Sequence, residues 1–144
     1  MAANISPRFS GKAHIEASTV VTAANTAKDG TGTVNTIYTA TTDGGLVRGV
    51  WAHPQGTNVA TVCRLFFNNG GTNATATNNI PGPTYSLPAT TLSETANTAM
   101  SPIFIAFPGA LADIPATWKI NVVLGTAVAA GWQFMVSGPN WSTA

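Results

Sequence analysis

Only 8% of this 144-residue chain is charged, and its formal net charge is +1, whereas an ordinary soluble domain carries about 25% charged residues. Its six Lys and Arg residues are dispersed, which argues against nucleic-acid binding, because that activity requires clustered cations. No apolar run approaches the roughly 20 residues needed to cross a bilayer. Intrinsic disorder is also excluded, since it needs low hydrophobicity and high net charge, and 44% of the residues are hydrophobic.

Neutral side chains take the place of the missing charge, chiefly Thr, Ala, Asn and Gly. A free monomer normally uses mixed charge to stay soluble and to keep its strand edges apart. Neutral hydroxyls and amides are easier to bury against another protein, so the composition predicts a component of an assembly. The single cysteine, Cys63, excludes an intrachain disulfide. Residues 1–12 lack the apolar stretch of a signal peptide, so we expect folding in the cytoplasm without standard export.

The first half of the chain alternates between strand and turn signals. Strands are expected over 12–22, 33–40 and 46–53, separated by Gly-rich turns that follow Asp29 and Asp43. The clearest strand is expected over 59–68. Its period-2 pattern predicts that one face points into the core, with the members Val59, Thr61, Cys63, Leu65 and Phe67.

The second half continues the pattern after a long polar segment. Residues 69–83 are expected to form a loop or a hairpin arm, and residues 93–100 could form one helical turn. Further strands are expected over 84–92, 103–107, 118–124 and 131–137; the first of these tolerates Pro88 only at an edge or bulge.

The fold class is therefore all-β. Eight candidate strands with frequent turns predict a single antiparallel β-sandwich or jelly roll over residues 12–138, with a closed barrel as the less favoured alternative. Residues 1–11 are expected to be an N-terminal arm, and residues 139–144 a C-terminal tail.

The chemistry-bearing residues form no catalytic cluster. His14 and Glu16 share one face of the first expected strand, where a solvated surface is the favoured interpretation. A metal or acid–base site that adds His53 is the alternative. Cys63 lies among apolar residues, which favours a buried structural cysteine over a nucleophile. We therefore expect no enzymatic activity, no metal and no cofactor.

The aromatic residues divide into two groups. Trp118 and Trp132 each begin an alternating apolar set, which favours a place in the core over a sugar-stacking platform. Phe9 and Trp141 lie near the two ends of the chain. Large aromatics on terminal arms are suited to anchor a partner, although local packing onto the sandwich is equally compatible with the sequence.

Several segments together resemble a family of small virion proteins of tailed bacteriophages. The most specific is residues 24–33, which read A-N-T-A-K-D-G-T-G-T. The others are Ser6-Pro7-Arg8-Phe9, Thr61-Val62-Cys63-Arg64-Leu65-Phe66, Leu87-Pro88-Ala89 and the run from Ile114 to Ile120. The chain departs from the family pattern at Thr117, where a Gly is expected, and at its C-terminus, which reads Gly-Pro-Asn-Trp from residue 138.

The resemblance implies a non-enzymatic β-sandwich that decorates or cements the head shell. The implied partner is the major capsid protein, the implied location is the capsid surface of the virion after assembly in the host cytoplasm, and a dimer or trimer is expected. The alternatives are a tail or fibre component, a carbohydrate-binding head appendage, or a small metal-dependent hydrolase. The predicted partner-contact residues are Arg8, Phe9, Lys12, Asn73 and Trp141.

Overall fold

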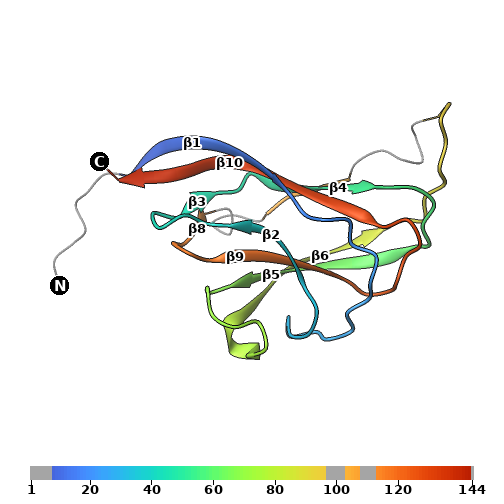
Figure 1. Cartoon of the computed structure of the whole chain (residues 1–144), viewed down its shortest axis with the longest axis horizontal. Coiled ribbons are helices and arrows are strands. Elements are labelled where there is room, and N and C mark those ends of the chain that lie inside the picture. Colours follow the sequence, from blue (N-terminus) through green and yellow to red (C-terminus); the bar gives the residue numbers. More distant parts are fainter. Residues whose placement is uncertain (1–7, 97–102, 108–112, 144) are drawn as a thin grey trace.

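The chain folds into two antiparallel β-sheets packed face to face, which confirms the predicted all-β sandwich (Figure 1). The structure is a computed structural model and describes residues 8–96, 103–107 and 113–143. We call the two layers sheet A and sheet B. Sheet A has the order β7-β4-β10-β3-β8, with β1 also paired to β10, and sheet B has the order β2-β9-β5-β6.

The strands have the following bounds. Sheet A contains β1 (Arg8–Ala17), β3 (Gly45–Leu46), β4 (Gly49–Pro54), β7 (Ile103–Ile105), β8 (Asp113–Ile114) and β10 (Trp132–Thr143). Sheet B contains β2 (Asn35–Thr39), β5 (Thr61–Asn68), β6 (Asn79–Leu87) and β9 (Lys119–Leu124). A short 3-10 turn, η1 (Ala76–Asn78), precedes β6. No helix in this described part of the chain has the length and hydropathy to cross a membrane.

The core lies between the two sheets and follows the period-2 pattern of the sequence. Cys63, Leu65 and Phe67 of β5 point inward and are at most 4% exposed, as predicted, whereas Val59 lies before the strand begins and is 58% exposed. Burial raises the pKa of the Cys63 thiol to about 12, so the thiol stays protonated and unreactive at neutral pH. Trp132 is fully buried, which confirms its predicted place in the core.

Residues 69–83, expected as a loop or a hairpin arm, combine the two: residues 69–78 connect the strands, and from Asn79 the segment is a hairpin arm. β6 already begins at Asn79 and pairs antiparallel with β5. It contains Pro81 and Pro83, which lack the backbone N–H that an internal strand would need. β6 can hold both prolines because it is the edge strand of sheet B. A register shift between Arg64 and Phe66 of β5 interrupts the ladder at the same place.

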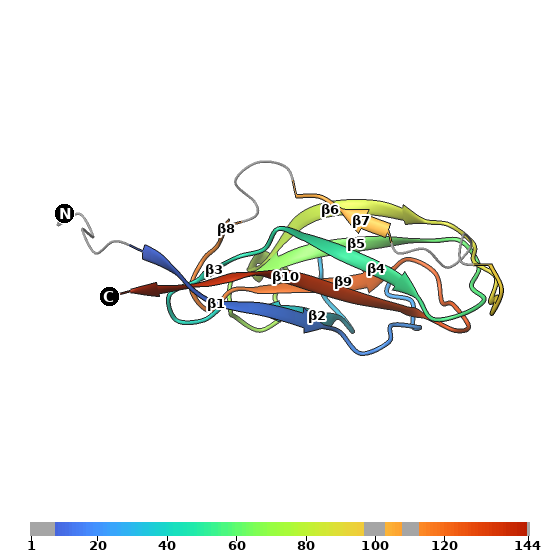
Figure 2. The ribbon, with the colours of Figure 1, turned by 90° about the horizontal axis from the view of Figure 1, so that it is seen from above.

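The ends of the described chain form a two-stranded ribbon. β1 pairs with β10 from Arg8 opposite Thr143 to Ala17 opposite Met135, with a shift in register after Ser10. The ribbon extends beyond the body of the sandwich in both views (Figures 1 and 2). Residues 8–11 and 139–143, expected as parts of an arm and a tail, are therefore paired strands.

Two loops cover the outer face of sheet B. Phe66 and Val123 project outward from this sheet, yet each is only 1% exposed. Gly30, in the β1–β2 connection, lies against the Phe66 ring. Asn73, in the β5–β6 connection, donates to the Gly32 carbonyl at 3.2 Å and accepts from Asn121 Nδ2 at 3.2 Å. The two loops thus form a polar layer tied to sheet B.

Thr117 is the one non-glycine residue among those described that has a positive φ, +63°. It occupies the third position of a turn that the hydrogen bond from Trp118 N to Pro115 O closes at 3.2 Å. A type II turn needs φ > 0 at that position, and the conformation is strained for a β-branched residue. Thr117, where the sequence resemblance implies a glycine, therefore occupies a strained position.

The substitution Thr117→Gly should raise the free energy of unfolding by about 1 kcal/mol, because glycine adopts this conformation without a steric penalty. Urea denaturation of the two proteins measures the difference. Thr39→Gly is the control, because Thr39 is an exposed residue within β2 where glycine should destabilise. A Thr117→Gly protein no more stable than the parent would contradict the assignment of strain.

Candidate functional site

Segments of four connections meet at the end of the sandwich farthest from the terminal ribbon, and none of these segments contains an ionisable side chain. They comprise residues 18–22, 56–60, 88–93 and 125–131. Hydrogen bonds link them: Leu92 N donates to Thr57 Oγ1 at 2.9 Å, and Val128 N donates to Thr22 O at 2.9 Å. We call this surface the loop end.

A single buried asparagine ties together three of the four segments of the loop end. Asn58 is 3% exposed, and its Nδ2 lies 3.0–3.2 Å from the carbonyl oxygens of Gly56 and Gly131 and from Thr90 Oγ1. Its Oδ1 accepts from the backbone N–H groups of Ala130 and Gly131 at 3.0 and 2.8 Å. The backbone of Asn58 also exchanges two hydrogen bonds with Thr90. One side chain thus satisfies buried polar groups of three separate connections.

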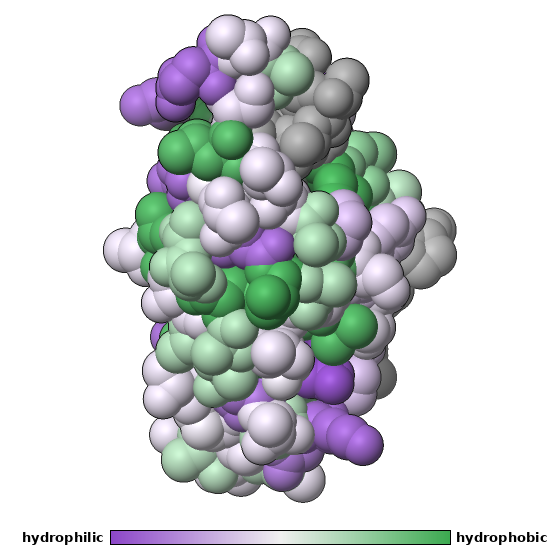
Figure 3. All heavy atoms as spheres, turned by 90° about the vertical axis from the view of Figure 1, so that its right-hand side faces the viewer, coloured by the Kyte–Doolittle hydropathy of each residue, from purple (hydrophilic) through white to green (hydrophobic). Residues whose placement is uncertain are grey.

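The loop end presents apolar side chains on this fixed backbone. Val20, Val59 and Leu92 are 44%, 58% and 56% exposed. Figure 3 faces this end and shows apolar side chains across its middle, among residues of intermediate hydropathy and some strongly hydrophilic ones. Exposed apolar groups that cluster on a rigid, uncharged surface are typical of a protein contact site. No charge must be desolvated when such a surface is covered.

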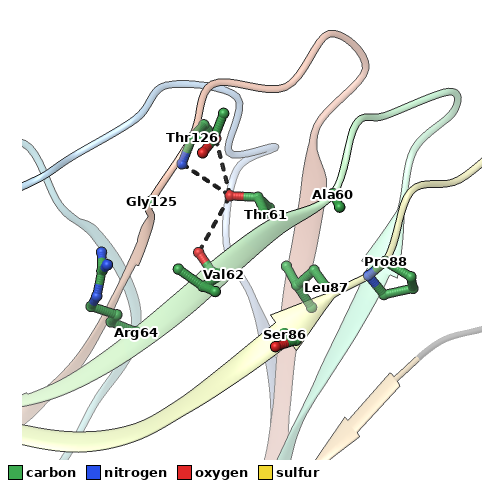
Figure 4. A pocket seen from close by; sticks show the side chains of 9 residues that line it. All are labelled: Ala60, Thr61, Val62, Arg64, Ser86, Leu87, Pro88, Gly125 and Thr126. Atoms are coloured by element: carbon green, nitrogen blue, oxygen red, sulfur yellow. Dashed lines mark hydrogen bonds between the residues drawn. The ribbon is translucent and has the colours of Figure 1, made fainter.

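A shallow depression of about 590 Å³ continues from the loop end onto sheet B (Figure 4). Thr61 Oγ1 bridges to Thr126, accepting from its N–H at 3.0 Å and donating to its carbonyl oxygen at 3.2 Å. Arg64 extends toward Gly125, whose missing side chain leaves room for the guanidinium. Its Nη1 is buried and makes no hydrogen bond to the described residues.

A row of apolar side chains crosses the outer face of sheet A. Phe104 of β7 pairs in register with Trp51 of β4, which pairs with Met135 of β10, which pairs with Ala17 of β1. The three larger side chains are 39–42% exposed. Register alone brings them together, because residues on three neighbouring strand pairs at the same level share a face.

The predicted contact residues lie in two places. Arg8, Phe9 and Lys12 belong to β1 of the ribbon, where Phe9 is 53% exposed and pairs with Ser142. Trp141 lies on the adjacent strand β10, half-buried, and its indole Nε1 donates to Asp113 Oδ1 at 2.9 Å. Asn73 lies apart from them in the polar layer on sheet B. Their role as partner contacts stays a prediction.

His14 differs from the expected member of a solvated face. Its ring stacks on Tyr38 with centroids 4.6 Å apart and planes 17° apart, and both ring nitrogens are buried without a partner. Tyr38 in turn donates its hydroxyl to Asn140 Oδ1 at 2.9 Å. This contact joins β1 to β2 across the two sheets. The prediction failed because the alternation along β1 does not show that an aromatic ring of the other sheet lies beneath it.

Sequence reasoning did not single out Asn58 or the loop end. Nothing local distinguishes Asn58 from the other asparagines, since its partners lie 32 and 73 residues away. The sequence did contain one usable signal. None of the four segments of the loop end carries a charged residue, and the sequence alone shows this. Within the described residues, no three His, Cys, Asp or Glu side chains lie close enough to hold a metal ion.

No family model matches the chain, and neither the curated proteins nor the solved structures match it. The resemblance to phage virion proteins therefore stays a prediction from the residues that carry it.

Replacing Asn58 by alanine should lower the free energy of unfolding by about 3 kcal/mol, because the substitution leaves several buried backbone groups unpaired. Equilibrium denaturation in urea measures the loss. Asn69→Ala provides the matched control, since Asn69 also bonds through both side-chain atoms but is exposed, and should cost less than about 1 kcal/mol. Equal losses in the two variants would refute a special role for Asn58.

Stability should fall as the pH drops below about 6.5, the ordinary pKa of histidine. Burial lowers the pKa of His14 in the folded chain, and the negative charge of Glu16 opposes this only in part. The unfolded chain therefore binds the proton more readily, and acid favours unfolding. His14→Phe keeps an aromatic ring on Tyr38 and removes the titration.

Thermal melts of both proteins from pH 5 to pH 8 test this prediction. The stability difference between parent and His14→Phe should be constant above the ordinary histidine pKa and should shift in favour of the variant below it. Parallel pH profiles for the two proteins would rule out His14 as the cause.

Proposed function

We propose that this chain is a structural protein of a phage virion, which binds the outer surface of the capsid and stabilises the head. The observation that carries the proposal is the loop end, where exposed valine and leucine side chains lie on a rigid backbone free of ionisable groups. The resemblance of the sequence to small virion proteins supplies the identity of the partner, the major capsid protein.

The proposed mechanism is mechanical. The sandwich spans a joint between capsid subunits and buries neutral and apolar surface on both. Rigidity matters because loops that are ordered beforehand lose little entropy on binding, and Asn58 orders three connections before any partner arrives. Each contact can be weak, since many copies act on one shell and a dimer or trimer of the chain adds avidity.

The surface chemistry also fits a shell protein. Binding through uncharged side chains depends little on ionic strength, because salt screens mainly interactions between charges. Arg64 lines the depression beside the apolar surface, where a guanidinium can offer N–H donors to an oxygen of a bound protein. The exposed face of the ribbon, with Phe9, offers a second contact for a neighbouring subunit or copy.

Placing a carboxylate on the loop end should weaken binding to undecorated heads by about tenfold or more, because the charge must be desolvated without a counter-ion. Val20→Asp tests this at a side chain that is 44% exposed. Ile80→Asp is the matched control, since Ile80 is also 44% exposed but lies on β6. Cosedimentation of labelled protein with heads measures affinity, and melting temperatures establish that both variants fold.

Wild-type protein should also raise the melting temperature of the heads. The proposal fails if Val20→Asp binds heads as well as the parent does, or if labelled protein is found at the tail alone. Equal weakening by Val20→Asp and Ile80→Asp would move the contact away from the loop end.

A further inference from the structure

A depression of about 440 Å³ lies on the outer face of sheet A, beside the apolar row. Three adjacent strands and the residue that follows β4 supply its lining, which consists of Ala17, Trp51, His53, Gln55, Gln133 and Met135. We call it the Trp51 pocket. It shares no residue with the loop end, so the two surfaces can be tested separately.

The aromatic wall of the pocket is held in place from one side. The Trp51 indole packs against Phe104 with ring centroids 4.8 Å apart and planes tilted by 47°. Phe104 itself occupies the space above Gly49, where any side chain would collide with its ring. Trp51 nevertheless remains 39% exposed. The indole thus offers part of its surface to a ligand without having to reorient.

Hydrogen bonds also hold the polar side chains on the opposite side of the pocket in place. Gln133 donates through Nε2 to the Ser18 carbonyl at 3.1 Å, and Gln55 Nε2 lies 3.3 Å from His53 Nδ1. Each contact uses only the nitrogen of a carboxamide. A carboxamide has two N–H donors and a carbonyl acceptor, so both glutamines can form further hydrogen bonds. No Asp, Glu, Lys or Arg lines the pocket.

This combination distinguishes between classes of ligand. An anion or a cation would find no opposite charge among the carboxamides. An apolar protein side chain would desolvate the two glutamines without pairing them, which is costly. A sugar satisfies both halves of the pocket, since one face of a pyranose ring presents C–H groups to the indole while its hydroxyls donate to and accept from carboxamides.

We propose that the Trp51 pocket binds an uncharged pyranose of a glycan. Trp51 stacks on the C–H face of the sugar ring, and Gln133, Gln55 and His53 bond its hydroxyl groups. The site adds an adhesive function to the chain, and it does not depend on whether the loop end binds a capsid.

Tryptophan fluorescence and two-dimensional NMR of the full chain test the proposal. The probes are the methyl glycosides of glucose, galactose, mannose and N-acetylglucosamine, together with lactose and cellobiose. At least one should bind saturably in the millimolar range, which is typical of a single contact of about 4 kcal/mol. The Trp51 indole N–H and the side-chain amide of Gln133 should shift with the same binding curve.

Two variants locate the binding. Trp51→Ala should weaken the affinity by about tenfold or more, whereas Trp51→Phe should retain part of it. Tyr85→Ala is the matched control, because Tyr85 is also 39% exposed but lies on β6 of the other sheet, and it should bind as the parent does. Melting temperatures establish that the variants fold.

The proposal is overturned if none of the six probes binds at concentrations up to about 50 mM, or if binding survives in Trp51→Ala. Equal loss in Trp51→Ala and Tyr85→Ala would overturn it as well. Binding of Trp51→Ala to undecorated heads remains a separate measurement, so failure of the sugar site and failure of the capsid contact are distinguishable.

Discussion

The carboxamide of Asn58 is the interaction on which the loop end depends. Connections between strands usually stay at the surface because their unpaired backbone groups need water. Here Asn58 supplies donors and acceptors to backbone groups from three connections while it is almost fully buried. The loops can therefore pack closely, and side chains such as Val59 are displayed on a backbone that is already ordered. The apolar surface that we propose as a contact site therefore rests on a structural hydrogen-bond network.

The same chemistry recurs on the outer face of sheet B. Asn25 Nδ2 donates to Thr31 O and Thr33 O at 2.8 and 2.7 Å, and Asn121, only 2% exposed, accepts from Thr36 while donating to Asn73. The many Asn and Thr residues therefore do more than make the surface neutral. Part of it replaces regular secondary structure by pairing loop backbone to side chains. A carboxylate or ammonium at the buried position of Asn121 would carry a large desolvation cost.

The fold was predictable where local pattern decides it. Alternation places Cys63, Leu65 and Phe67 in the core without further information. The start of β6 was not predictable, because prolines argue against a strand unless its edge position is known, and pairing order is a property of the whole sheet. The environments of His14 and Asn58 were not predictable for a related reason. Their environment comes from residues far away in sequence, such as Tyr38 and Gly131, and no periodicity along one strand reports contacts between sheets or loops.

The position of the charges is more informative than their scarcity. Lys28 and Asp29 lie in the β1–β2 connection beyond the loop end, Arg48 lies beside the ribbon, and Glu94 is the first ionisable residue after Leu92. Charge is thus absent from the four segments of the loop end and from the lining of the Trp51 pocket, while it is kept elsewhere. A low overall charge would by itself favour association through any face. Segregation limits favourable burial to the faces without ions, because covering an unpaired ion costs far more than covering a hydroxyl or an amide.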